Sequence, residues 1–256
     1  MTTPSSINRL GSYLSIATTI RQVFRVRQER IPESAPGSTP WASSIAARSA
    51  ASMVVRGRAT METMSSGPLV LPNLTGDRVT LRAWRTTDVG VVQEASQDRF
   101  ITALTTVPQT SGESEALAFI ERQHERLRSR EAYVFAIADT EDRAVGHIGL
   151  FHAGERWARA SVGYWIGPSQ RRRGYAADAL ATLTAWARRL DDLDRVELYV
   201  EPWNEGSWRA AERAGYVREG LLRAWERVDG SPQDMYMYAQ VTERVQHAEQ
   251  EGRAAP

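Results

Sequence analysis

The chain has 256 residues and a formal net charge of +1, with 42% hydrophobic and 25% charged residues, which is the composition of an ordinary globular protein. It contains no cysteine, and this excludes disulfides, thiolate metal sites and a cysteine nucleophile. All 32 basic residues are arginine, so a catalytic Schiff-base lysine is excluded as well.

Spacing and hydropathy argue against two further classes of protein. The four histidines form neither an H-x-x-x-H nor an H-E-x-x-H pattern, so we expect no metal site. No apolar run approaches 18 residues, so we expect no membrane-spanning helix.

The net charge hides an asymmetry along the chain. Eight arginines against Glu29, Glu33 and Glu62 give residues 1–65 a charge of +5, which leaves −4 for the remainder. A mildly acidic remainder is unlike the basic surface of a general nucleic-acid binder, so we expect no nucleic-acid partner.

Residues 1–65 are rich in Ser, Thr, Ala and Arg, and Pro32, Pro36 and Pro40 interrupt them. This composition predicts a disordered basic extension. The alternatives are a translation start at Met61 or Met64, a regulatory or membrane-surface arm, and a targeting segment.

A regular pattern begins at Leu69. In chain order it predicts a strand over 79–85, helices over 87–97 and 113–130, a hairpin of 133–138 with 144–151, a strand over 159–166, a helix over 176–190, a strand over 195–200, a short helix over 207–213, and a hairpin of 216–227 with 233–241. The helix over 113–130 is expected to bury Leu117, Ile120, His124 and Leu127 on one face. Residues 243–256 read as a polar tail.

Hairpins mixed with helices predict one α/β domain over residues 66–242. Its sheet should be mixed, mostly antiparallel, and covered by helices on both faces.

The segment 170–176 joins a strand-like run to a helix-like run and reads QRRRGYA. The first N–H groups of a helix have no partner within it, and the helix dipole adds positive potential there. Gly174 allows a close backbone approach or a positive φ, and three consecutive arginines add charge. The segment therefore predicts a site for a pyrophosphate-bearing cofactor, although an arginine-rich turn alone is often no more than solvated surface.

Several segments resemble the GNAT N-acetyltransferases of the RimJ/RimL type. Residues 171–176 match the coenzyme A motif Q/R-x-x-G-x-G/A, and residues 163–168 look like the bulged strand before it. Residues 200–207 resemble the N-x-x-S segment, 214–220 the G-[FY]-x-x-E-G turn, and 77–82 the first strand. The resemblance covers about residues 69–242 and implies the GNAT fold, acetyl-CoA as co-substrate and no metal.

The resemblance assigns the coenzyme A contacts mainly to backbone N–H groups. On the loop these belong to Arg171, Arg172, Arg173, Gly174, Tyr175 and Ala176. The strand before the loop contributes the backbone of Trp165, Ile166 and Gly167, with an N–H near Ile166 as the expected oxyanion donor.

Two further residues carry over from the N-x-x-S segment. Asn204 would bind the amide region of the pantetheine arm, and Ser207 would donate a proton to the departing thiolate. Both residues could instead cap the helix that starts there.

The catalytic base implied by the resemblance is Glu226, which lies 19 residues after Ser207 and would act through a water. A carboxylate can accept an ammonium proton when partial burial raises its pKa. Glu201 and Asp234 are the alternative carboxylates, and Glu226 could also be an ordinary surface residue.

The sequence therefore predicts a cytoplasmic N-acetyltransferase that acts by direct attack in a ternary complex and forms a possible homodimer. The predicted acceptor is a protein N-terminal α-amine, whose unperturbed pKa is lower than that of a lysine amine. A small-molecule amine (an antibiotic, polyamine or amino acid) is the alternative acceptor. An inactive coenzyme A-sensing module is the alternative from another class.

Overall fold

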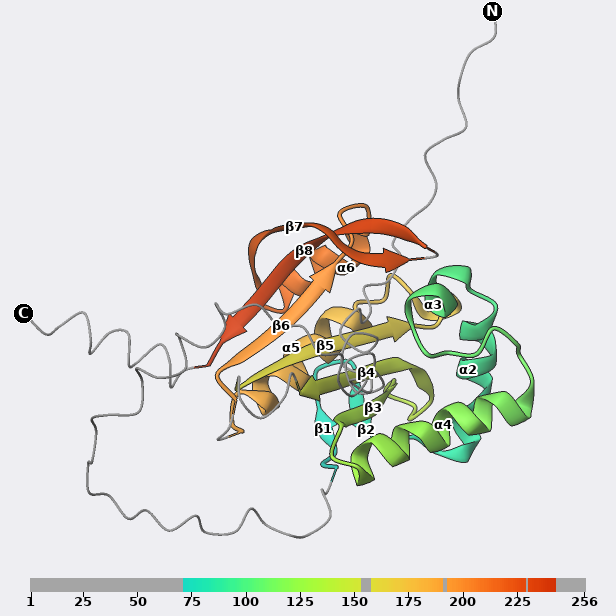
Figure 1. Ribbon diagram of the computed structural model, residues 1–256. Helices are drawn as coiled ribbons and strands as arrows, with labels where there is room; N and C mark the ends of the chain where they lie inside the picture. The colour runs from blue at the N-terminus through green and yellow to red at the C-terminus, as the bar shows by residue number, and fades with distance from the viewer. Residues whose placement is uncertain (1–70, 153–157, 191–192, 229, 243–256) are drawn as a thin grey trace, which may run out of the picture.

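The computed structural model describes residues 71–152, 158–190, 193–228 and 230–242 (Figure 1). The predictions for residues 1–65 and 243–256 lie outside the described residues.

Eight strands form one sheet in the order β1-β2-β3-β4-β5-β6-β8-β7. They are β1 (Leu74–Thr75), β2 (Thr80–Arg82), β3 (Ala132–Ala138), β4 (Ala144–His152), β5 (Arg159–Ile166), β6 (Arg195–Val200), β7 (Val217–Val228) and β8 (Ser231–Val241). All neighbours pair antiparallel except β5 and β6, which are parallel. The predicted mixed, mostly antiparallel sheet is confirmed.

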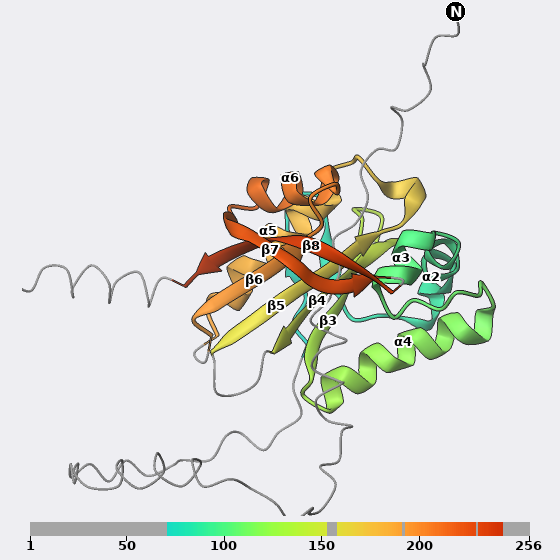
Figure 2. The same ribbon diagram turned by 45° about the horizontal axis from the view of Figure 1, so that its top comes forward.

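Helices cover both faces of this sheet, as predicted (Figure 2). The α-helices are α2 (Val89–Ser96), α3 (Arg99–Leu104), α4 (Glu113–Arg128), α5 (Tyr175–Ala187) and α6 (Glu205–Arg213), and short 3-10 turns are η1 (Thr86–Asp88) and η2 (Pro168–Gln170). Alternate residues of β3 point to opposite faces, so Val134 and Ala136 pack with the α2–α4 side while Phe135 and Ile137 pack with the α5 and α6 side.

Two local features differ from the sequence prediction. The buried stripe of α4 contains Ala116, Phe119, Ile120 and Gln123, whereas Leu117 is 36% exposed. The predicted buried face of α4 was therefore wrong: the observed face is rotated from it by part of a helical turn, because the large Phe119 ring packs inward. Helix α3 was not predicted, although Asp98 caps it through the N–H groups of its first turn.

The strands β5 and β6 separate along their length. Their paired residues are limited to Arg159–Ser161 on β5 and Arg195–Glu197 on β6, while β5 continues to Ile166 and β6 to Val200. The carboxyl-terminal halves of these two strands therefore leave a split in the middle of the sheet. Helices α5 and α6 are the next α-helices after β5 and β6 along the chain, and residues of the first turn of each line the pocket described below.

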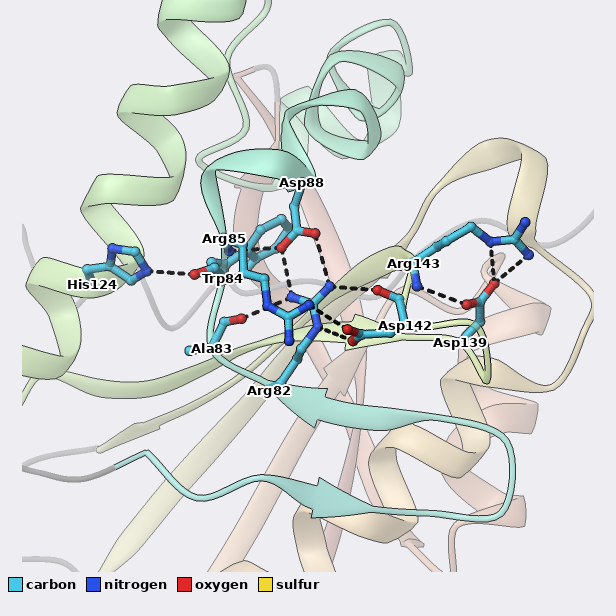
Figure 3. Close-up of polar contacts among 9 residues, drawn as sticks. All are labelled: Arg82, Ala83, Trp84, Arg85, Asp88, His124, Asp139, Asp142 and Arg143. Carbon is cyan, nitrogen blue, oxygen red and sulfur yellow. Dashed lines mark hydrogen bonds and ion pairs between the residues drawn. The ribbon is translucent and has the colours of Figure 1, made fainter.

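A buried charge network joins β2 to η1 and to the β3–β4 turn (Figure 3). The Arg82 guanidinium donates to both carboxylate oxygens of Asp88 at 2.8 and 3.0 Å, and its Nε donates to Asp142 Oδ1 at 2.7 Å. Side chains of Arg82 and Asp88 are 4% and 6% exposed. Asp142 also accepts a bond from Arg85, whose side chain is about half exposed.

Arg82→Lys is expected to destabilise the fold by about 1–3 kcal/mol, because an ammonium cannot reproduce the two-pronged bond and leaves acceptors of buried Asp88 unmet. Urea unfolding measures this change. Arg85→Lys is the matched control. Arg85 is an exposed partner of Asp142, the second carboxylate that Arg82 binds, so this change should lower the free energy of unfolding by less than about 1 kcal/mol. Equal losses in the two variants would contradict the prediction.

Candidate active site

A pocket of about 280 Å³ opens at the split, on the face that α5 and α6 cover. Its walls come from β5, the β5–α5 loop, the first turn of α5, and one face along the length of α6. The lining residues are Tyr164, Ile166, Gln170, Arg171, Arg172, Gly174, Tyr175, Ala176, Ala177, Gly206, Ser207, Arg209, Ala210 and Arg213.

The loop between β5 and α5 has the backbone shape of an anion-binding turn. Arg172 and Gly174 take positive φ values of 64° and 84°, and Gly174 directly precedes the first residue of α5. Alternation between left-handed and ordinary backbone turns successive N–H groups toward one side. The unpaired N–H groups of the first turn of α5 add to this cradle.

Four arginines line the pocket, and their side chains differ in how firmly other residues hold them. The Arg171 side chain is held inside the fold, since it donates to Asp98 Oδ2 at 2.8 Å and to the Ile166 carbonyl at 3.3 Å. Arg172 is exposed. Arg209 and Arg213 lie one turn apart on α6, and the sequence analysis missed them. Arg173, which was also predicted to bind the cofactor, is exposed and does not line the pocket.

The alternation of β5 decides which backbone groups face the split. The Gly167 N–H donates to the Val145 carbonyl of β4 at 2.9 Å. Because successive residues of a strand turn their N–H groups to opposite edges, the Ile166 N–H faces the split and the Trp165 N–H faces β4. Of the three predicted strand residues, Ile166 alone lines the pocket.

Asn204 and Ser207 come together at the start of α6, and their side chains do not cap that helix. Asn204 is the residue before the first helical position, yet its side chain makes no capping bond. Its Nδ2 donates instead to Glu201 Oε2 at 3.1 Å. The Ser207 hydroxyl lies 2.6 Å from the Tyr164 hydroxyl. The capping explanation therefore does not account for these two side chains.

The three candidate carboxylates have different environments. Glu201 follows β6 directly and is 2% exposed. Glu226 lies on β7 opposite Gln233, is half-buried, and is near enough that its charge acts on Glu201. Asp234 is exposed and accepts a bond from the Ala224 N–H at 2.8 Å, so it holds the irregular part of the hairpin.

The model of the acetyltransferase (GNAT) domain matches residues 78–217, which is more than half of the chain. The chain belongs to the GNAT acetyltransferases. The resemblance noted in the sequence is thereby confirmed, and the GNAT enzymes are acyltransferases.

Individual relatives agree with this assignment. The GNAT chain is 27% identical over 164 residues to p20 of Bacillus licheniformis, described only as an uncharacterized N-acetyltransferase, covering 64% of this chain and 92% of p20. A Vibrio cholerae structure, provisionally described as a ribosomal-protein-serine acetyltransferase, matches with a TM-score of 0.56 at 25% identity, covering 66% of this chain and 97% of that one. The ribosomal L7/L12 α-N-protein acetyltransferase RimL in complex with coenzyme A shares the fold, with a TM-score of 0.56 at 18% identity over 68% and 98% of the two chains.

Within the described residues of this GNAT chain, no His, Cys, Asp and Glu side chains gather into a group that could hold a metal ion. None of the helices in this part of the chain is both long and apolar enough to cross a bilayer.

Two buried polar atoms at this site lack a hydrogen-bond donor. In the described part of the chain, Gln170 Oε1, on a residue that lines the pocket, and Asn204 Oδ1, on a residue that does not line it, are buried and accept no hydrogen bond. A buried acceptor without a donor is costly, so a ligand with N–H or O–H groups would satisfy these atoms. The pantetheine arm of coenzyme A carries amide N–H groups, and its phosphates match the loop and arginines. The residues present therefore fit this cofactor.

Burial raises the pKa of Glu201 from 4.5 to about 8, and the charge of Glu226 adds to the rise. A carboxyl whose pKa is higher in the folded than in the unfolded state stabilises the fold at pH values below its pKa in the unfolded chain. That contribution is lost as the pH rises from about 4.5 through about 8.

Glu201→Gln is therefore expected to flatten the fall in melting temperature between pH 5 and pH 9. The melting temperature of the variant and of the unmodified protein would be measured across this range. Glu141→Gln, which removes a carboxylate that is 68% exposed, is expected to keep the original slope. An unchanged slope in Glu201→Gln would show that Glu201 does not carry this pH dependence.

Proposed function

We propose that this chain is an acetyl-CoA-dependent N-acetyltransferase whose acceptor is the α-amine of a protein N-terminus. The observation that carries the proposal is the arrangement of groups around the split. The β5–α5 loop and Ser207 line the pocket at the split, and the buried Glu201, which the charge of Glu226 reaches, directly follows β6.

The acyl donor would be held by the loop and by the split edge of β5. Backbone N–H groups at Gly174, Tyr175 and Ala176 would bind the phosphates, with charge from Arg172, Arg209 and Arg213. Asn204 Oδ1 would accept an amide N–H of the pantetheine arm. The Ile166 N–H would stabilise the oxyanion that develops on the thioester carbonyl.

Starting from the ammonium, the chemistry then needs two protons removed from the nitrogen and one delivered to sulfur. Acetyl-CoA supplies an activated thioester, and the amine can attack it directly without a covalent acyl-enzyme. Glu226, acting through a water, would accept the ammonium proton. Ser207 would donate to the departing sulfur.

The α-amine acceptor is supported by two observations. Its unperturbed pKa of about 8 demands less of a carboxylate base than a lysine amine at about 10.4. The Vibrio cholerae relative is described as acting on a ribosomal protein, and RimL as an α-N-protein acetyltransferase. The cytoplasmic location and the homodimer stay predictions.

The test combines calorimetric titration with acetyl-CoA and thiol-release turnover against N-terminal peptides, aminoglycosides and polyamines. Binding with turnover on the peptides is expected. Turnover only on a small amine would replace the acceptor, and binding without turnover on any amine would favour a coenzyme A sensor. Absence of binding would refute the proposal.

A further inference from the structure

Tyr164 contacts Ser207 at the floor of the pocket, and the proposed chemistry has so far given it no part. It lies on β5, and its hydroxyl oxygen is 2.6 Å from Ser207 Oγ across the split. Both residues line the pocket, and they are only 2% and 3% exposed. The bond therefore joins β5, beside the split, to the first turn of α6.

The direction of this hydrogen bond follows from the two hydroxyls. A phenol is a stronger acid than an alcohol, so Tyr164 is the better donor and Ser207 the better acceptor. The other acceptor near the Tyr164 hydroxyl, the Ser207 carbonyl, is more distant at 3.4 Å. Burial keeps the tyrosine protonated, because it raises the pKa of Tyr164 above its ordinary value, and the charge of Glu201 and the neighbouring Tyr216 act in the same direction.

We propose that Tyr164 is a positioning residue whose hydroxyl donates to Ser207 Oγ and thereby directs the Ser207 proton into the pocket, toward the sulfur of the acyl donor. A serine hydroxyl has one proton and would otherwise rotate among several acceptors. With Tyr164 as donor, the proton of Ser207 is left for the sulfur. The inference rests on the proposed acetyl transfer.

The transfer balances with Tyr164 in this role. The C–N bond forms while the C–S bond breaks, and the electron pair of the C–S bond stays on sulfur. The amine nitrogen loses one proton and the sulfur gains one. Counted from the ammonium, the nitrogen loses a second proton, to solvent, as the amide forms. Ser207 supplies the sulfur proton and regains one from solvent, and Glu226 releases its proton to solvent, so Tyr164 and Ser207 are unchanged after a full cycle.

The experiment compares Tyr164→Phe, Ser207→Ala and the double variant with a matched control. Tyr216→Phe removes the hydroxyl of a second buried tyrosine, which lies 2.7 Å from Thr184 Oγ1 and does not line the pocket. Both Tyr→Phe changes delete one buried hydroxyl and keep the ring. Urea unfolding of each variant shows that the fold is retained.

The first readout is the ionisation of bound coenzyme A, and it needs no turnover. Thiolate absorbance of the complex is followed against pH, with proton release on binding checked by calorimetry in two buffers. A hydrogen bond to the thiolate lowers the pKa of the thiol, so Tyr164→Phe and Ser207→Ala should each raise it by about one unit. Tyr216→Phe should leave it unchanged. An unchanged thiol pKa in Tyr164→Phe would overturn the inference.

The second readout is kinetic. Tyr164→Phe should lower kcat about tenfold, in keeping with one lost hydrogen bond, and leave KM for acetyl-CoA within about twofold. In the Ser207→Ala background it should cause no further loss, because its effect passes through Ser207. Additive losses, or an equal loss in Tyr216→Phe, would assign Tyr164 a merely structural part.

Different outcomes would refute the proposed acetyl transfer and the positioning role of Tyr164. A protein that binds no coenzyme A would refute the proposed function itself. A protein that binds and turns over, with Tyr164→Phe indistinguishable from the unmodified chain, would refute only the positioning part of Tyr164.

Discussion

Gly174→Asp is expected to weaken acetyl-CoA binding by at least about 100-fold, because it places a like charge beside the phosphates and like-charge contacts cost several kcal/mol. Gly174 has a φ of 84° and stands at the start of α5. Backbone of this kind approaches a ligand closely, and any side chain there is strained. Calorimetric titration with acetyl-CoA measures the loss.

Two controls separate charge at the phosphate loop from backbone strain. Gly230 has a similar φ of 79° at the β7–β8 turn, and nothing lies within 4 Å of an added Cβ. Gly230→Asp should therefore carry the same strain and keep normal binding. A Cβ on Gly174 would meet Arg78 only at an ordinary 3.6 Å, so Gly174→Ala tests strain without a clash or charge. Normal affinity in Gly174→Asp would refute the phosphate-binding role of the loop.

The sequence predicted those features that depend on local pattern. The hairpin of β3 with β4 and the helix after residue 174 follow from periodicity, since strand and helix spacing is set within a few residues. The positive φ of Gly174 was likewise anticipated from the glycine between arginines and a helix start. The family motif then assigned the expected coenzyme A contacts to the loop over residues 171–176.

Features that depend on distant parts of the chain could not be predicted. Tyr164 and Ser207 are separated by 43 residues, and their contact requires both the split and the docking of α6. The rotation of α6 also decides that Arg209 and Arg213 face the pocket. The spacing of four between these arginines after Ser207 was a readable signal, but it does not say which face of the helix is covered.

The burial of Glu201 is a consequence of tertiary structure that changes how the carboxylates are assigned. From sequence, Glu226 was the predicted base and Glu201 an alternative. Burial raises the pKa of Glu201 to about 8, so at pH 7 a smaller share of Glu201 is in the ionised form that can accept a proton. Glu226 therefore stays the proposed base at neutral pH, and the contribution expected of Glu201 grows as the pH approaches 8.

Glu226→Gln is accordingly expected to lower kcat at pH 7 by well over tenfold, within the range of general base catalysis, while the affinity for coenzyme A stays nearly unchanged. The amide keeps the size of the side chain and removes only the basic oxygen. Steady-state kinetics at pH 7 and calorimetry with coenzyme A measure the two quantities. Turnover unaltered by the change would remove Glu226 as the base.

Glu201→Gln is the paired variant, and the pH dependence distinguishes the two carboxylates. If Glu226 is the base, Glu201→Gln keeps most of the activity at pH 7. In Glu226→Gln the pKa of Glu201 should fall, because the charge that raises it has been removed. A rise in kcat/KM with an apparent pKa near 8 that disappears in Glu201→Gln and persists in Glu226→Gln would instead assign proton abstraction to Glu201, with Glu226 setting its ionisation.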